Sequence, residues 1–410
     1  MNGKLRRYFT LDPGPNAVPA LDGLRGVAIL MVVLFHGVES FDPPDAALLP
    51  LGGFDLATPI YSGWMGVNLF FVLSGFLITW HLIRRWHESP DRHDIRRYLL
   101  RRLLRIVPTY YVVLWIAAAG VVPHYEIDRN LLGLQVAWHL ALLQDYLPSS
   151  ILGPFWSLGV EEKFYLFMPV VLYVAWRITR NRWRVVLLAS IALLPLVIRL
   201  ILYPGHAAAH PEDFLRNWRN PFHLNLDSLL LGAIAAWVAL RHTREPNPIL
   251  AAIPNHLVTA GTTLVAGLMV APLLVPDLAF FRHVLMFPLT ALGMGLILFG
   301  SALKPRGSSP LLEGKLLARA GRLAYPWYLT HVLVLHWVWG EMTTRFPTLA
   351  RLAPAEQLGL FLPVFLIASI AVALVLHFVV EKPCLILKDS LGRSARVQER
   401  ESPALTPHTA

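Results

Sequence analysis

The chain has 410 residues, of which 55% are hydrophobic and only 15% are charged, with a formal net charge of +10. A soluble globular protein carries about 25% charged residues, so this composition excludes an ordinary soluble enzyme, and it equally excludes a disordered or fibrous chain. The single cysteine, Cys384, cannot form a disulfide bond within the chain. The composition is that of an integral membrane protein.

Ten apolar segments come close to the ~20 residues that a membrane-spanning helix needs. They lie at 21–38, 64–83, 106–122, 157–176, 184–203, 222–240, 255–275, 280–302, 323–340 and 357–380. An eleventh segment, 131–147, is short and contains His139, Gln144 and Asp145, so we expect it to be re-entrant or interfacial. The sequence therefore predicts an all-α integral membrane protein with about ten transmembrane helices.

The basic residues predict the orientation of these helices, because cytoplasmic loops are enriched in Lys and Arg. A count of ten spans places both termini in the cytoplasm, together with the basic stretches 84–105, 177–184, 241–244 and 304–322. The segment 39–63 has no Lys or Arg and faces outward. Positive charge that follows the loops in this way does not form a nucleic-acid-binding patch. We expect one membrane domain, residues 1–381, and a disordered cytoplasmic tail, residues 382–410.

Two ionisable residues lie within the first span. Arg25 and His36 are eleven positions apart, which places them on one helix face about 16 Å apart along the axis. Ionisable groups inside a membrane usually mark a functional site, and histidine is the usual general base. The alternative is an arginine that extends to the membrane surface and an interfacial histidine.

A cluster of arginines follows the second span. Arg102 and Arg105 are three positions apart, so their side chains share one face of a predicted helix, and Arg101 lies beside them. Paired guanidinium groups bind phosphate well. A phosphorylated cytoplasmic cofactor and anionic lipid headgroups are equally good interpretations.

The fourth and ninth spans add further polar candidates. Glu161 lies toward the outward end of its span, where a carboxylate could orient or charge-stabilise His36; the alternative is an acid that favours the helix dipole. Tyr328 and His331 are three apart and share a helix face. Because no spacing typical of metal ligands stands out, we expect no catalytic metal.

Several sequence blocks together resemble the membrane acyltransferase family three. These are LDGLRGVAILMVVLFH (21–36), with an Arg, ten residues and then His; GVNLFFVLSGFLIT (66–79); the Arg-Xaa-Xaa-Arg at 102–105; FWSLGVEEKFYLF (155–167); LAYPWYLTH (323–331); and VEKP (380–383). They occur in the family's order over nearly the whole chain.

The resemblance implies transfer of an acyl group, acetyl above all, from cytoplasmic acyl-CoA to a hydroxyl, catalysed by a multi-pass protein of the bacterial inner (plasma) membrane. The acceptor would be a carbohydrate or glycolipid, for example of lipopolysaccharide, exopolysaccharide or peptidoglycan. The alternatives are a macrolide or other small-molecule hydroxyl and, from a different class, a secondary transporter. A transporter should show two related halves in its sequence, and no such internal repeat is visible. The assembly could be a homodimer.

Roles for the candidate residues follow from the same resemblance. His36 would act as general base or carry the acyl group, Glu161 would orient it, and Arg25 or helix backbone donors would stabilise the oxyanion. The CoA phosphates would bind Arg102 and Arg105, with Arg101 beside them. Tyr328 and His331 would bind the acceptor or relay a proton.

Overall fold

The computed structural model describes residues 8–11, 18–41, 47–52, 54–88, 95–147, 149–206, 218–274, 279–304 and 309–388. The α-helices are α2 (Pro19–Glu39), α3 (Thr58–Tyr61), α4 (Met65–Glu88), α5 (Ile95–Ala118), α6 (Leu132–Leu140), α7 (Trp156–Arg177), α8 (Asn181–His206), α10 (Leu226–Arg244), α11 (Pro248–Ala252), α12 (Pro254–Leu274), α13 (Met286–Leu303), α14 (Lys315–Arg345) and α15 (Pro354–Leu376). Short 3-10 or π segments are η1 (Ser62–Trp64), η2 (Gly153–Phe155), η4 (Phe222–Leu224), η5 (Phe281–Leu285), η6 (Pro347–Arg351) and η7 (His377–Glu381). Strands β1 (Pro50–Leu51) and β2 (Phe54–Asp55) form a small antiparallel hairpin.

Each of the ten predicted spans is a helix: α2, α4, α5, α7, α8, α10, α12, α13, α14 and α15. Among the described residues, six helices are long and apolar enough to cross a membrane, and they include α2, α4, α8, α12, α13 and α15. The other four, α5, α7, α10 and α14, are 24, 22, 19 and 31 residues long and do not meet this criterion. α5, α7 and α14 each carry four or five charged side chains. An all-α membrane protein is therefore confirmed, with six spans by this criterion.

The segment predicted to be re-entrant or interfacial contains the nine-residue helix α6. Such a helix is about 14 Å long, which is too short to cross a bilayer. A buried hydrogen bond anchors it to α5, because the Tyr110 hydroxyl lies 2.9 Å from Nδ1 of His139. α6 is thus packed against the bundle and does not form an eleventh transmembrane helix.

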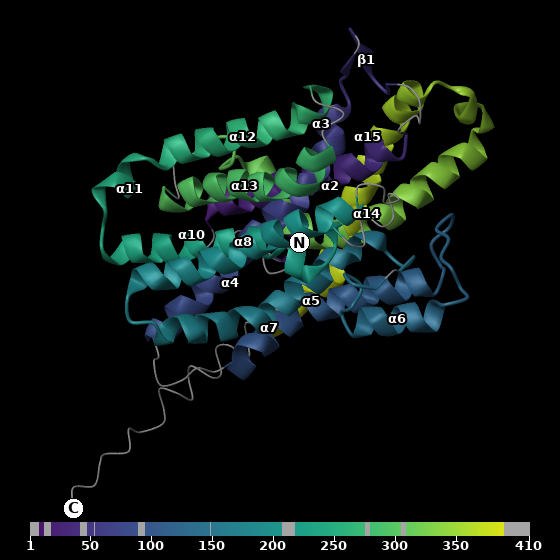
Figure 1. The fold of residues 1–410 in the computed structure, drawn as a ribbon. Helices are drawn as coiled ribbons and strands as arrows, with labels where there is room; N and C mark the ends of the chain where they lie inside the picture. The colour runs from purple at the N-terminus through teal and green to yellow at the C-terminus, as the bar shows by residue number, and fades with distance from the viewer. Residues whose placement is uncertain are drawn as a thin grey trace, which may run out of the picture.

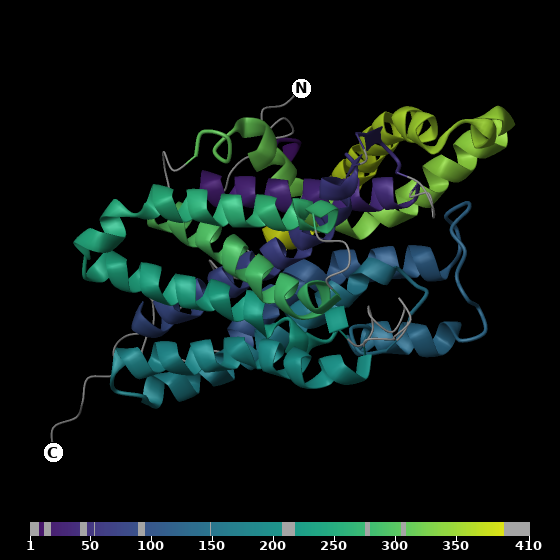
Figure 2. The same ribbon diagram turned by 45° about the horizontal axis from the view of Figure 1, so that its top comes forward.

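α2 lies near the centre of the bundle and packs along α14 on one side and α4 on another. α10 packs on α4, α8 and α13, and α12 packs on α13 (Figures 1 and 2). One buried apolar cluster joins residues of α2, α4, α5, α7, α14 and α15. The helices that carry the candidate residues are therefore the ones that share this core.

The contact between α2 and α14 is unusually close because glycines face backbone across it. A Cβ atom on Gly321 would lie 1.8 Å from the carbonyl oxygen of Asp22, and one on Gly26 would lie 2.1 Å from that of Leu317. Small residues at such positions let two helix backbones approach within a membrane. The glycines therefore set the register of α2 against α14.

The two described ends of the chain meet. Lys382 donates hydrogen bonds to the carbonyl oxygens of Tyr8 and Thr10, and Arg322 of α14 donates one to that of Leu11. Residues 382–388, which we assigned to the tail, are helical and continue η7; residues 389–410 of the tail lie outside the described residues, as does most of the basic N-terminus. We call the end of the bundle that holds Arg322 and Lys382 the basic end.

We expect Gly321→Ala to lower the thermal stability of the purified protein by several degrees, because the added methyl group would push α14 away from α2. Overpacking of this kind costs about 1–3 kcal/mol. Gly359→Ala in α15 is the matched control, because nothing lies within 4 Å of a Cβ atom there. Thermal unfolding in detergent measures both variants, and equal midpoints would contradict the close contact.

Candidate active site

A cavity of about 510 Å³ lies at the basic end of the bundle. Residues of α2, α4, α5, α7, α14 and the C-terminal helical segment line it. Its lining includes six cationic side chains, Arg25, Arg102, Arg105, Arg322, Lys382 and Lys388, and three acidic ones, Asp22, Glu161 and Glu381. This excess of positive charge favours an anionic ligand.

Neighbouring groups hold the arginines of the cavity in place. The guanidinium carbon of Arg102 lies 5.7 Å from the ring centre of Tyr98 and 5.3 Å from that of Tyr165, distances typical of cation–π contacts. Asp22 pairs with Arg25 at 3.0 Å and with Arg322 at 3.4 Å. Guanidinium groups fixed in this way lose little entropy when they bind a phosphate.

Arg102 and Arg105 of α5 face the cavity, whereas their neighbour Arg101 does not line it. The three-residue spacing of Arg102 and Arg105 predicts this shared position. On a helix, adjacent residues point about 100° apart. The structure therefore groups two of the three predicted phosphate-binding arginines.

Glu161 contacts a different partner from the one we expected. Its carboxylate accepts a hydrogen bond from the Ser74 hydroxyl of α4, and it lines the same cavity as Arg25. The side chain that hydrogen-bonds His36 is His331. The structure therefore gives Glu161 and His36 different partners, because α7 places this carboxylate in the cavity that the arginines line.

His36 of α2 and His331 of α14 form a pair, with Nε2 of His331 3.2 Å from Nδ1 of His36 and the ring centres 4.9 Å apart. Nδ1 of His36 lies 2.9 Å from the carbonyl oxygen of Val32, and Nδ1 of His331 lies 2.7 Å from that of Tyr328. A carbonyl oxygen only accepts, so both Nδ1 atoms carry hydrogen, and Nε2 of His331 accepts from His36. This assignment follows from the hydrogen-bond network and leaves a lone pair on Nε2 of His36. Such an imidazole can accept a proton.

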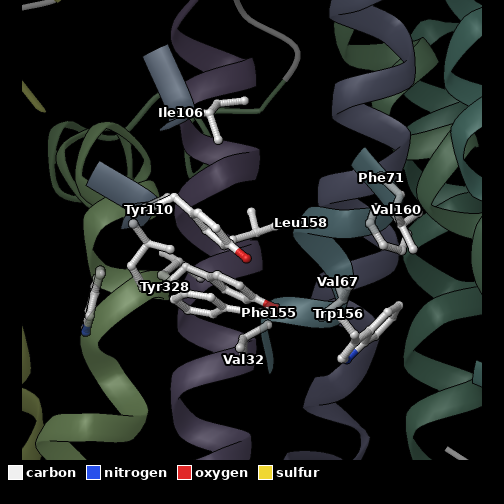
Figure 3. Close-up of a cluster of buried hydrophobic side chains, with 14 of the residues drawn as sticks. Val32, Val67, Phe71, Ile106, Tyr110, Phe155, Trp156, Leu158, Val160 and Tyr328 are labelled. Carbon is white, nitrogen blue, oxygen red and sulfur yellow. The ribbon is translucent and has the colours of Figure 1, made fainter. Parts of the chain in front are cut away.

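Tyr328 connects the cavity with the histidine pair. Its hydroxyl lies 2.6 Å from Oγ of Ser157 and 2.7 Å from the carbonyl oxygen of Pro154, and both Tyr328 and Ser157 line the cavity. Its ring centre is 5.6 Å from that of His331. Figure 3 shows Tyr328 packed beside Phe155 and other apolar side chains of the core. The inner end of the cavity is thus closed by a buried, hydrogen-bonded tyrosine.

Four residues of this region were not among our sequence candidates: Ser74, Ser157, Arg219 and Arg322. Ser74 and Ser157 lie inside the family-like blocks, so those blocks could have drawn attention to them. Arg219 precedes α10 and interacts electrostatically with His36, but its place in a loop gives no periodic signal. Among the described residues, no group of three or more His, Cys, Asp or Glu could hold a metal ion.

A comparison with known families gives the identity of the fold. The profile of acyltransferase family 3, described as an acyltransferase domain, matches residues 18–378. The chain belongs to this family. The resemblance is therefore confirmed and the protein is an acyltransferase, which sets aside the transporter alternative.

Curated relatives have names that agree with the family. The peptidoglycan O-acetyltransferase OatA of Listeria monocytogenes is 32% identical over 203 residues, which are 46% of this chain and 30% of the relative. YrhL of Bacillus subtilis, provisionally named a peptidoglycan O-acetyltransferase, is 31% identical over 206 residues, 46% of this chain and 29% of the relative. A Staphylococcus aureus protein provisionally named an O-acetyltransferase is 24% identical over 253 residues, 58% of this chain and 38% of the relative. The aligned part of the chain thus spans about a third of the length of these relatives. No solved structure matches the chain.

We expect His331→Ala to lower the acyl-transfer rate about 100-fold, the size of effect seen when a catalytic group is misplaced by about 1 Å. The double variant with His36→Ala should then be no slower than His36→Ala alone, because the two imidazoles act as one unit. Single-turnover rates of the three variants test this. Multiplicative losses would show that the two histidines act independently.

Proposed function

We propose that the protein transfers an acetyl group from cytoplasmic acetyl-CoA to a hydroxyl of a cell-surface carbohydrate. The observation that carries this proposal is the cation-rich cavity that ends at Tyr328, with the His36–His331 pair against that tyrosine. The anionic donor needs a basic environment, which the cavity provides. The acceptor hydroxyl needs a proton acceptor, which the histidine pair provides. The names of the relatives favour acetyl as the acyl group and a peptidoglycan-type sugar as the acceptor.

Ten spans with both termini in the cytoplasm are the topology that fits this reaction, in the inner (plasma) membrane. α10 has 19 residues, which gives about 28 Å, close to the hydrocarbon thickness of a bilayer. The charges that distinguish α5 and α7 include Arg102, Arg105 and Glu161, which line the cavity and so need not face lipid. Positive charge on the inside then assigns the basic end to the cytoplasm, with α6 interfacial or re-entrant on the opposite side.

The donor would bind at the basic end. Its phosphates suit the guanidinium groups of Arg102 and Arg105, with Arg322 and Lys382 nearby in the same cavity. The uncharged pantetheine arm would extend along the cavity toward Tyr328 and carry the thioester to the histidine pair. This arrangement keeps the charged part of the donor out of the membrane interior.

His36 would act as the general base. Its Nε2 atom takes the proton of the acceptor hydroxyl while the hydroxyl oxygen attacks the thioester carbonyl. Collapse of the tetrahedral intermediate breaks the carbon–sulfur bond, and the CoA thiolate recovers the proton from His36. The products are the acyl ester and free CoA, and His331 holds the imidazole in the required tautomer throughout.

We expect His36→Ala to abolish steady-state acetyl transfer and to leave at most a slow single-turnover rate, because the proton acceptor is lost, while expression and membrane insertion persist. The matched control is His336→Ala, an exposed histidine on the same helix as His331. Membranes that contain each variant are incubated with radiolabelled acetyl-CoA and assayed for label in carbohydrate. Steady-state transfer that survives the loss of His36 would refute its catalytic role.

We expect the double variant Arg102→Ala/Arg105→Ala to raise the KM for acetyl-CoA at least tenfold and that for the acceptor little, because two phosphate contacts are lost. Arg101→Ala is the control, since Arg101 is not among the residues that line the cavity. Steady-state kinetics in proteoliposomes measures both constants. A larger rise in the KM of the acceptor would assign the two arginines to acceptor binding.

A further inference from the structure

The reaction proposed above needs positive charge near His36, where the thioester oxygen becomes an oxyanion. Arg25 is the candidate from the sequence, but it pairs with Asp22 and lines the cavity at the basic end. Its eleven-residue separation from His36 corresponds to about 16 Å along α2. An arginine side chain cannot cover that distance while it remains paired, so the oxyanion requires a different donor.

Arg219 is a second cationic side chain that acts on the histidine pair. It belongs to the segment of residues 218–220 before η4 and α10, and it interacts electrostatically with both His36 and Tyr328. Its guanidinium carbon lies 5.3 Å from the ring centre of Trp64 and 5.6 Å from that of Trp156. The arginine is thus held between two indole rings next to the residues that would meet the thioester.

The guanidinium of Arg219 makes no hydrogen bond or ion pair with any described residue; Glu39 interacts with it electrostatically at longer range. None of its nitrogen atoms is among the fully buried side-chain atoms that lack a hydrogen-bond partner, so its five N–H donors stay accessible to a ligand. The two indoles hold the guanidinium by cation–π contacts.

Neighbouring contacts link Arg219 to Tyr328, at the inner end of the cavity. Trp156, which stacks on Arg219, is followed directly by Ser157, whose hydroxyl bonds Tyr328 at the inner end of the cavity. A thioester that passes Tyr328 to reach His36 would therefore come near the guanidinium, which interacts electrostatically with both residues. The imidazole would face the attacking hydroxyl and the guanidinium the carbonyl oxygen.

We propose that Arg219, held by Trp64 and Trp156, stabilises the oxyanion of the tetrahedral intermediate in the acyl transfer at His36. The inference rests on the proposed function. As the acceptor oxygen bonds to the thioester carbon, the carbonyl electron pair moves to oxygen, and two N–H groups of Arg219 donate to that oxygen. When the carbon–sulfur bond breaks, the pair returns and the ester carbonyl leaves the guanidinium.

The test compares Arg219→Gln and Arg219→Lys with wild type in proteoliposomes, with labelled acetyl-CoA as donor and an N-acetylglucosamine trisaccharide as acceptor probe. Losing an oxyanion donor lowers kcat about 100- to 1000-fold. We therefore expect such a loss in Arg219→Gln, with both KM values within about threefold of wild type, because the contact forms only in the transition state. Arg219→Lys should recover part of the rate through its charge.

Two controls separate this role from others. Arg241→Gln removes an exposed arginine that pairs with Glu245 at the surface and should leave kcat unchanged, and thermal unfolding checks that each variant folds. Arg219→Gln that keeps kcat within twofold, or that raises only the KM of the acceptor, overturns the inference and leaves the acetyltransferase proposal standing. Wild-type protein that transfers no label to any carbohydrate overturns both.

Discussion

The close contact between α2 and α14 determines most of the candidate site. The backbone approach at Gly321 and Asp22 fixes the two helices in one register, and rigid helices transmit that register along their length. Near the contact, Asp22 pairs with Arg25 and Arg322. Toward the other ends of the helices, the same register brings His36 to His331. A single helix interface therefore aligns the wall of the basic cavity with the His36–His331 pair.

Two arginines, the buried Arg199 and the half-buried Arg219, differ in how their charge is satisfied. Arg199 of α8 is 1% exposed, pairs with Asp227 at 3.0 Å and donates to the carbonyl oxygen of Leu224 at 2.7 Å. Its charge is balanced within the protein, which is the pattern of a structural ion pair between helices. Arg219 has aromatic rings as its close contacts instead of a carboxylate. The contrast supports a role for Arg219 toward a ligand.

The helices and part of the site could be predicted from the sequence. Within the described residues, apolar segment lengths located the ten long helices. Spacing within one helix placed Tyr328 with His331 correctly, because helix geometry relates residues three or eleven positions apart. The partner of Glu161 could not be predicted in this way. It depends on how far α7 is shifted along α2 and α4, and apolar lipid-facing surfaces carry no periodic signal for such a shift. Arg219 was missed for a related reason, since a loop residue is placed only by the helices around it.

The position of Tyr328 bears on how a membrane enzyme can transfer an acyl group from a charged donor on one side of the membrane to an acceptor on the other side. A continuous channel wide enough for CoA would also conduct ions. Here the cavity ends at the hydrogen bonds of Tyr328 with Ser157 and Pro154, inside the apolar core. In the proposed reaction only an uncharged acyl arm would have to pass this point, which avoids the cost of moving phosphates through hydrocarbon. The charge of the proposed donor would stay with the arginines of the basic end, and the developing negative charge would arise where we propose that Arg219 acts.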